Sequence, residues 1–109
     1  MRVIIIDAKE KRVYEKEIEN GLKPLQDIVG GYIEIAHRFD NSNDDVIFVN
    51  EEGLFEPAPR NYFMFFGAHQ PFAGNGVICG DGVGTNLSVK EIESKVKFLT
   101  EEQIQLYFK

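Results

Sequence analysis

Three side chains could carry acid–base or thiol chemistry near neutral pH, namely His37, His69 and Cys79. A nucleophilic or general-base mechanism needs such groups within hydrogen-bonding distance of one another. His37 falls in an alternating strand pattern and His69 in the irregular segment GAHQPF. Cys79 falls in an apolar run, where we expect a buried and unreactive thiol. No motif joins the three, so the sequence favours a non-enzymatic function and leaves enzymatic activity undecided.

The acidic stretch DNSNDDVIFVNE could bind a cation. Counted as a twelve-residue calcium loop, it places Asp40, Ser42 and Asp44 at the first, third and fifth ligand positions. It also places Glu51 at the last position. However, Asp45 stands where that loop needs a glycine, and the exit segment VIFVN is typical of a strand rather than a helix. We expect a hairpin turn without a metal, and a calcium site is the alternative.

The glycine-rich segment GDGVGTN, residues 80–86, follows the apolar run GVIC and precedes a predicted helix. This order suits a phosphate-binding loop, because the N-terminus of a helix presents free backbone N–H groups. The spacing of Gly80, Gly82 and Gly84 does not match the dinucleotide fingerprint, and the loop contains no basic residue. We therefore expect a flexible loop, with contact to a small molecule or nucleotide as the alternative.

Aromatic residues gather in a stretch that proline and glycine interrupt. The six rings are those of Phe55, Tyr62, Phe63, Phe65, Phe66 and Phe72. We expect core packing for this group, as is usual for aromatic clusters. Six rings exceed what a short irregular element readily buries, and any ring left exposed would form a surface for a partner or for self-association.

Composition limits the possible classes of function. The chain has 109 residues, which suits one domain spanning 1–109, and its 43% hydrophobic content is ample for a core. Eighteen acidic and twelve basic residues give a net charge of −6, which opposes direct binding of nucleic acid or of anionic membranes and suits a cationic partner. The apolar run at residues 3–6 is too short for a signal peptide or a membrane span, so we expect a cytoplasmic protein. We expect no cofactor.

The elements that must position these residues follow from hydrophobic periodicity. Strand patterns cover residues 3–6, 12–18, 32–39 and 46–50. The segment LKPLQDIV has the spacing of a short helix, and Gly30 is suited to end it because a glycine has no Cβ to clash in the left-handed conformation. Gly31 then leads into a strand in which Ile33, Ile35 and His37 share one face with Phe39. Gly30 and Gly31 thus form a predicted structural joint.

The C-terminal part adds one more strand and two helix starts. Gly76–Cys79 is a short apolar strand. Ser88 with Glu91, and Thr100 with Gln103, have the spacing of capping boxes. The segment KVKFL between them is either helical or extended. We predict an α+β fold: a mainly antiparallel sheet of about four or five strands, a short helix after the second strand, and one or two C-terminal helices.

Several short motifs occur in a fixed order along the whole chain. They are VGGYIE at 29–34, NEEG at 50–53, a Pro59 and Asn61 element, GVICG at 76–80 and LTEEQI at 99–104. In this combination the chain resembles a family of small proteins of unknown function that are encoded by bacteriophages, prophages and plasmids. The resemblance implies a mobile-element accessory protein in the bacterial cytoplasm and supplies no catalytic residues.

The resemblance, the acidic balance and the aromatic excess together favour a non-enzymatic binding protein that modulates a host protein. One alternative is a small-molecule or nucleotide binder that uses residues 80–86, and another is an acidic DNA mimic. The candidate binding residues are Tyr32, Glu34, Asn50, Glu51, Asn61, Tyr62, Gly80, Asp81, Gly82 and Gly84.

Overall fold

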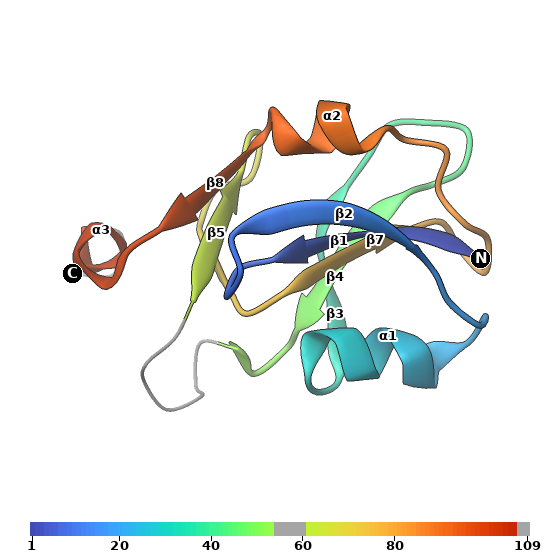
Figure 1. The fold of residues 1–109 in the computed structure, drawn as a ribbon, viewed down its shortest axis with the longest axis horizontal. Helices are drawn as coiled ribbons and strands as arrows, with labels where there is room; N and C mark the ends of the chain where they lie inside the picture. The colour runs from blue at the N-terminus through green and yellow to red at the C-terminus, as the bar shows by residue number, and fades with distance from the viewer. Residues whose placement is uncertain (54–60, 107–109) are drawn as a thin grey trace.

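In the computed structural model, residues 1–53 and 61–106 form two antiparallel sheets and three short helices (Figure 1). The larger sheet has the strand order β2-β1-β7-β4-β3, and the smaller sheet has the order β6-β5-β8. The predicted α+β fold with a mainly antiparallel sheet is therefore confirmed. In chain order the elements are β1 (Arg2–Asp7), β2 (Arg12–Glu17), α1 (Leu22–Val29), β3 (Ile33–Arg38), β4 (Val46–Asn50), β5 (Tyr62–Phe65), β6 (Phe72–Ala73), β7 (Gly76–Cys79), α2 (Val89–Glu93), β8 (Val96–Leu99) and α3 (Glu101–Gln105).

The larger sheet is covered on both faces, and the alternation of side chains along β1 shows how. Val3 and Ile5 pack toward α1, whereas Ile4 and Ile6 pack toward the smaller sheet and α2. Figure 1 shows α1 on one side of the sheet and α2 on the other. All four side chains are at most 3% exposed. The unbroken apolar run in β1 is therefore explained by its central place between two layers.

β3 contains an irregularity that the alternating pattern did not predict. The pattern places Ile33, Ile35, His37 and Phe39 on one face. In the structure the register with β4 shifts between Ile35 and His37, so that Ala36 is an extra residue. Ile33 packs on the α1 side of the sheet, whereas Phe39 packs on the opposite side. The predicted shared face is wrong, because one inserted residue reverses the faces of all residues that follow.

Most of the clustered aromatic residues lie in the strands of the smaller sheet. The buried rings are those of Tyr62, Phe63, Phe65 and Phe72, which confirms core packing for these four. Phe66 follows directly after β5 and is 80% exposed. Phe55 lies outside the described residues.

Both predicted capping boxes are present at the C-terminal helices. Ser88 Oγ accepts a hydrogen bond from the Glu91 N–H at 3.1 Å, and Thr100 Oγ1 accepts one from the Gln103 N–H at 3.2 Å. The ambiguous segment between the helices is a strand, β8, that pairs with β5. Its extended form is explained by that pairing, which adds a third strand to the smaller sheet.

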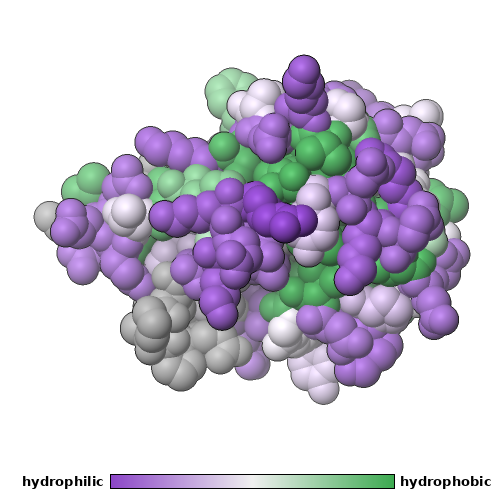
Figure 2. Space-filling model, viewed as in Figure 1, coloured by the Kyte–Doolittle hydropathy of each residue, from purple (hydrophilic) through white to green (hydrophobic). Residues whose placement is uncertain are grey.

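The surface is mostly hydrophilic on the face shown in Figure 2, where β2 lies in front and apolar side chains reach the surface on either side of it. None of the helices in residues 1–53 and 61–106 has the length and apolar character needed to cross a membrane.

Candidate functional site

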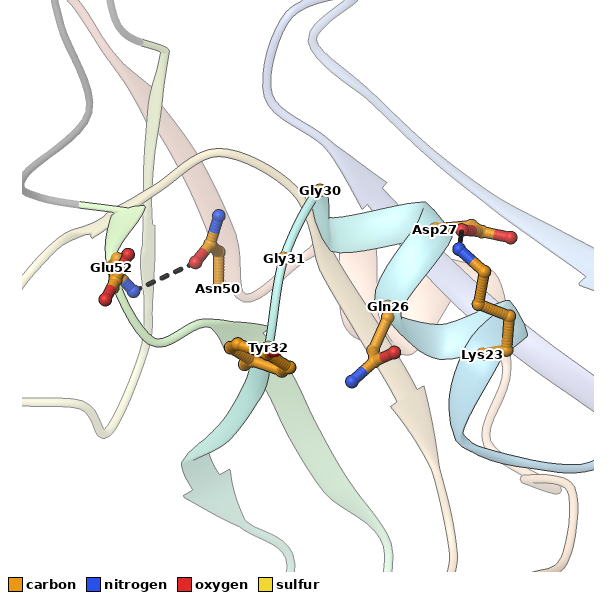
Figure 3. A pocket seen from close by; sticks show the side chains of 8 residues that line it. All are labelled: Lys23, Gln26, Asp27, Gly30, Gly31, Tyr32, Asn50 and Glu52. Carbon is orange, nitrogen blue, oxygen red and sulfur yellow. Dashed lines mark hydrogen bonds and ion pairs between the residues drawn. The ribbon is translucent and has the colours of Figure 1, made fainter.

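The surface is hollowed where α1 ends, β3 begins and β4 ends (Figure 3). The cavity has a volume of about 480 Å³. We call it the α1–β3–β4 site, and its lining residues are Lys23, Gln26, Asp27, Gly30, Gly31, Tyr32, Asn50 and Glu52. It brings together the predicted glycine joint and two of the candidate binding residues, Tyr32 and Asn50.

The first glycine of the joint has a conformational task. Gly30, the residue predicted to end the helix, is its C-cap with φ 85°, in the left-handed region. The backbone N–H groups of Gly30 and Gly31 both donate to the carbonyl oxygen of Gln26, at 2.8 and 3.2 Å. A Cβ on Gly30 would meet nothing within 4 Å, so the backbone angle alone accounts for a glycine here.

The second glycine has a packing task. A Cβ on Gly31 would lie 2.8 to 3.0 Å from the side-chain carboxamide of Asn50. Asn50 Oδ1 in turn accepts the N–H of Glu52 at 2.9 Å, and the Glu51 N–H donates to the carbonyl oxygen of Tyr32 at 2.9 Å. The second of these hydrogen bonds links the end of β4 to the joint, and the first fixes the orientation of the Asn50 side chain.

The site contains several polar side chains that have no partner within the part of the chain that the structure describes. Lys23 Nζ forms an ion pair with Asp27 Oδ1 at 2.6 Å, so these two charges offset each other. Within residues 1–53 and 61–106, no hydrogen bond or ion pair engages the side chains of Gln26, Tyr32 or Glu52. Tyr32 is 69% exposed. The amide of Gln26, the phenol of Tyr32 and the carboxylate of Glu52 line this cavity and can each form hydrogen bonds with a ligand.

Further carboxylates lie next to the cavity. An adjoining hollow of about 180 Å³ shares Asn50 with the α1–β3–β4 site and is lined by Glu34 and Glu51, two more candidate binding residues. Neither carboxylate forms an ion pair in the described part of the chain. With Glu52, three carboxylates that have no cationic partner among residues 1–53 and 61–106 lie around the two hollows.

The sequence analysis missed the contribution of α1 to the site. Lys23, Gln26, Asp27 and Gly30 follow the spacing i, i+3, i+4 and i+7, which places them along one face of the helix. Their polar face is the complement of the apolar face that buries Leu25 and Val29. That spacing was a readable signal for a polar surface beside the joint.

The glycine-rich segment 80–86 has a different environment. The Gly80 N–H donates to the carbonyl oxygen of Val83 at 2.9 Å, and the Thr85 N–H donates to that of Arg2 at 2.9 Å. Arg2 Nη1 donates to the carbonyl oxygen of Thr85 at 3.0 Å, and Asn43 Nδ2 donates to that of Gly84 at 3.1 Å. Gly80 is buried, whereas Asp81 and Gly82 are exposed. The polar groups of this loop thus mainly form hydrogen bonds with β1 and with the turn before β4.

The acidic turn before β4 also forms a hydrogen bond with this loop. Asp45 is 1% exposed, and its Oδ2 accepts hydrogen bonds from Asn41 Nδ2 at 2.8 Å and Thr85 Oγ1 at 3.0 Å. In the alternative calcium site, Asp40, Ser42 and Asp44 are exposed, and Glu51 lies beyond the far end of β4. The structure does not bring these four together. No group of three His, Cys, Asp or Glu side chains within residues 1–53 and 61–106 could hold a metal ion.

The remaining chemical candidates lie apart from the α1–β3–β4 site. Cys79 is 1% exposed, and burial, followed by the nearby charge of Asp45, raises the pKa of its thiol to about 11, which confirms the predicted unreactive cysteine. The His37 ring packs against Phe65 with ring centroids 5.0 Å apart. Burial, followed by the charge of Lys95, lowers the pKa of His37 from 6.5.

Three other predicted residues do not line the cavity. His69 is exposed between β5 and β6. Tyr62 is buried in a small cluster with Leu99 and Ile104 on the face of the smaller sheet next to α3. Asn61 lies at the start of β5, where its carbonyl oxygen accepts the Gly74 N–H at 2.7 Å.

Comparison with known proteins gives the family. No curated protein and no solved structure matches the chain. A family model does match it, and the match covers residues 1–109. The chain therefore belongs to the family described as Domain of unknown function (DUF3846).

Proposed function

We propose that this protein is a non-enzymatic binding protein whose α1–β3–β4 site receives a positively charged side chain, arginine above all, from a partner protein. One observation carries the proposal: an aromatic ring that is 69% exposed, Tyr32, stands among carboxylates that have no cationic partner within the described residues. A guanidinium group can stack on such a ring while it donates hydrogen bonds to a carboxylate.

The chain contains an internal example of this interaction. The guanidinium carbon of Arg12 lies 4.1 Å from the centroid of the Tyr14 ring. Tyr14 therefore has its cation within the molecule. In the part of the chain that the structure describes, no cation lies over the ring of Tyr32. The same type of ring at the α1–β3–β4 site is available for an arginine from outside.

The local field also favours a cation. α1 ends at this site, and the C-terminus of a helix carries a partial negative charge. Among the lining residues that the structure describes, Lys23 alone is basic, and its pairing with Asp27 offsets its charge. Glu52, with Glu34 and Glu51 in the adjoining hollow, supplies acceptors for a guanidinium group.

The position of β3 supports a protein as the partner. β3 is the last strand of the larger sheet, and within the described residues no strand pairs with its outer edge. An extended partner segment could add its backbone there, which gives affinity, while its arginine occupies the neighbouring cavity, which gives specificity. The exposed side chain of Ile35, at 43%, offers an apolar contact on the same edge strand.

A small cationic molecule is a second candidate for the same cavity. Its volume of about 480 Å³ falls within the range of about 300–1,000 Å³ that is common for ligand pockets. The nucleotide site at residues 80–86 is supported less well, because Gly80 and Thr85 already donate their backbone N–H groups within the protein. The DNA mimic, the modulation of a host factor and the origin in a mobile element stay predictions.

The test is binding of a defined peptide to the full chain. We expect a fluorescein-labelled Gly-Arg-Gly-Arg-Gly peptide to bind, and the same peptide with citrulline in place of arginine to bind much more weakly, because citrulline has no charge. Tyr32→Ala should weaken binding by about 1 kcal/mol, which is roughly fivefold. Fluorescence anisotropy measures both effects.

Leu106→Ala is the matched control, since it removes another exposed apolar side chain that is not among the lining residues of the site. This variant should bind the labelled peptide as the unmodified protein does. Equal binding of the arginine and citrulline peptides, or full binding by Tyr32→Ala, would contradict the proposal.

A further inference from the structure

A second exposed aromatic ring lies on the smaller sheet and has the opposite electrostatic environment. Phe66 lines a hollow of about 530 Å³ between the end of β5 and the start of β8. The charged residues that line this hollow are Lys95 and Lys97, both basic, in a protein whose net charge is −6. We call it the Phe66 surface, and the residues that define it are Met64, Phe66, Lys95, Val96 and Lys97.

Strand pairing holds these side chains in place. Met64 pairs with Lys97 across the two strands, so their side chains are neighbours on one face of the sheet. The backbone N–H of Phe66 donates to the carbonyl oxygen of Lys95 at 2.8 Å. Lys97 lies in β8, and Phe66 and Lys95 directly adjoin the paired strands, so their backbone is held by strand pairing rather than in a long loop, which suits a docking surface.

The two surfaces are complementary in charge and similar in chemistry. The α1–β3–β4 site and its adjoining hollow are lined by Tyr32 and by three carboxylates with no ion pair in the described residues, whereas the Phe66 surface is lined by a phenyl ring and two lysines. They share no residue. Contact between them would bring opposite charges together and would remove both exposed rings from water.

We propose that the Phe66 surface of one copy docks on the α1–β3–β4 site of a second copy, with Lys95 and Lys97 facing Glu51 and Glu52 and with Phe66 packing beside Tyr32. This inference rests on the proposed function, because it names a second copy of this chain as one partner of that cation-accepting site. A contact between two different surfaces is heterologous, so each copy keeps one free surface of each kind. Assembly then continues to a ring or a filament.

Two properties follow from this geometry. The assembly should dissociate as salt is added, since exposed charges contribute to the contact. It should also dissociate in the presence of the Gly-Arg-Gly-Arg-Gly peptide, because the peptide and the Phe66 surface occupy the same site.

Two complementary variants test the heterologous contact by sedimentation velocity. Lys95→Glu with Lys97→Glu removes the basic surface, and Glu51→Lys with Glu52→Lys removes the acidic one. Each double variant alone should stay monomeric at concentrations where the unmodified chain assembles at low ionic strength. An equimolar mixture should assemble again, because one unmodified surface of each kind remains and the two reversed surfaces are also opposite in charge. Lys9→Glu with Lys11→Glu, in the turn between β1 and β2, changes the charge equally and should assemble normally.

The outcomes separate this inference from the proposed function. A chain that stays monomeric at every concentration but still binds the arginine peptide through Tyr32 overturns the self-association alone. The self-association is also overturned if both double variants still assemble, or if their mixture forms no complex. A chain that assembles as described but does not distinguish the arginine and citrulline peptides overturns arginine recognition and leaves the self-association in place. Unchanged melting temperatures of the variants show that each result concerns the surface rather than the fold.

Discussion

The larger sheet has a glycine-rich segment near each end of β4. At residues 80–86 the glycines allow backbone to pack on backbone: a Cβ on Gly84 would lie 2.8 Å from the backbone nitrogen and oxygen of Arg2. At the joint, Gly30 has a left-handed backbone conformation, and a Cβ on Gly31 would meet the side chain of Asn50 rather than backbone atoms. The two segments therefore use glycine for different reasons. The sequence predicted a structural joint at Gly30 and Gly31 and a flexible loop at residues 80–86, with a ligand contact as the alternative for the loop.

The polar groups around the two segments also differ, in how many of them have a hydrogen-bond partner within the described part of the chain. Around residues 80–86, Arg2 donates to the loop backbone and Thr85 donates to Asp45 Oδ2, whereas the buried Asp45 Oδ1 has no hydrogen-bond partner within the described residues. Around the joint, Gln26 and Tyr32 keep side chains with no partner in the described part of the chain. Buried polar groups that satisfy each other stabilise a fold, whereas exposed unsatisfied groups beside a cavity are available to a ligand. Glycine content alone does not distinguish the two cases.

The largest expected effect concerns the stability of the loop at 80–86. Gly84→Ala should lower the free energy of unfolding by about 3 kcal/mol, because the added Cβ meets the backbone of β1, which cannot move aside cheaply. Urea denaturation measures this loss. A loss below about 1 kcal/mol would show that the loop does not pack tightly on β1 and would remove the contrast between the two segments.

A smaller effect is expected at the joint. Gly30→Ala should lower the free energy of unfolding by about 1 kcal/mol, because a Cβ at this position meets no other atom and only the left-handed backbone angle is unfavourable. The same urea titration measures it. The variant should still bind the arginine peptide, since Gly30 supplies no side chain to the cavity. Unchanged stability would contradict the structural role of the joint.

The smallest effect depends on pH and lies away from both segments. His37 packs against Phe65 in the layer between the two sheets, and its pKa in the folded state is below 6.5. The unfolded chain therefore binds a proton more readily, and the stability that neutral His37 provides should be lost as the pH falls below about 6.5. His37→Gln should remove this component of the pH dependence.

The measurement is the difference in unfolding free energy between the unmodified chain and His37→Gln at about pH 7.5 and about pH 5. This difference should shift in favour of the variant at the lower pH. A difference that does not change with pH would contradict the lowered pKa of His37.

Much of the fold could be predicted from local sequence. The capping boxes at Ser88 and Thr100 and the strand buried on both faces at Val3–Ile6 depend only on residues close in the chain. The bulge at Ala36 could not be predicted, because one inserted residue leaves the hydrophobic pattern of β3 intact. The exposure of Phe66 depends on where β5 ends against β8, which is set by long-range pairing.

The candidate site was predicted only in part for a related reason. Tyr32 and Asn50 could be named from motifs, but their approach depends on the pairing of β3 with β4. The role of residues 80–86 depends on the hydrogen bond between Thr85 and Asp45, which are 40 positions apart in the sequence. No local pattern reveals whether such a distant polar partner exists.

The central claim is that the free polar groups at the joint, rather than the glycine-rich loop, form the binding site. A titration of the ¹⁵N-labelled full chain with the Gly-Arg-Gly-Arg-Gly peptide, followed by two-dimensional NMR, tests it most directly. Amide signals of Gly31, Tyr32 and Glu52 should shift with peptide concentration, while those of residues 80–86 should stay in place. Shifts confined to residues 80–86, or no shifts at all, would contradict it.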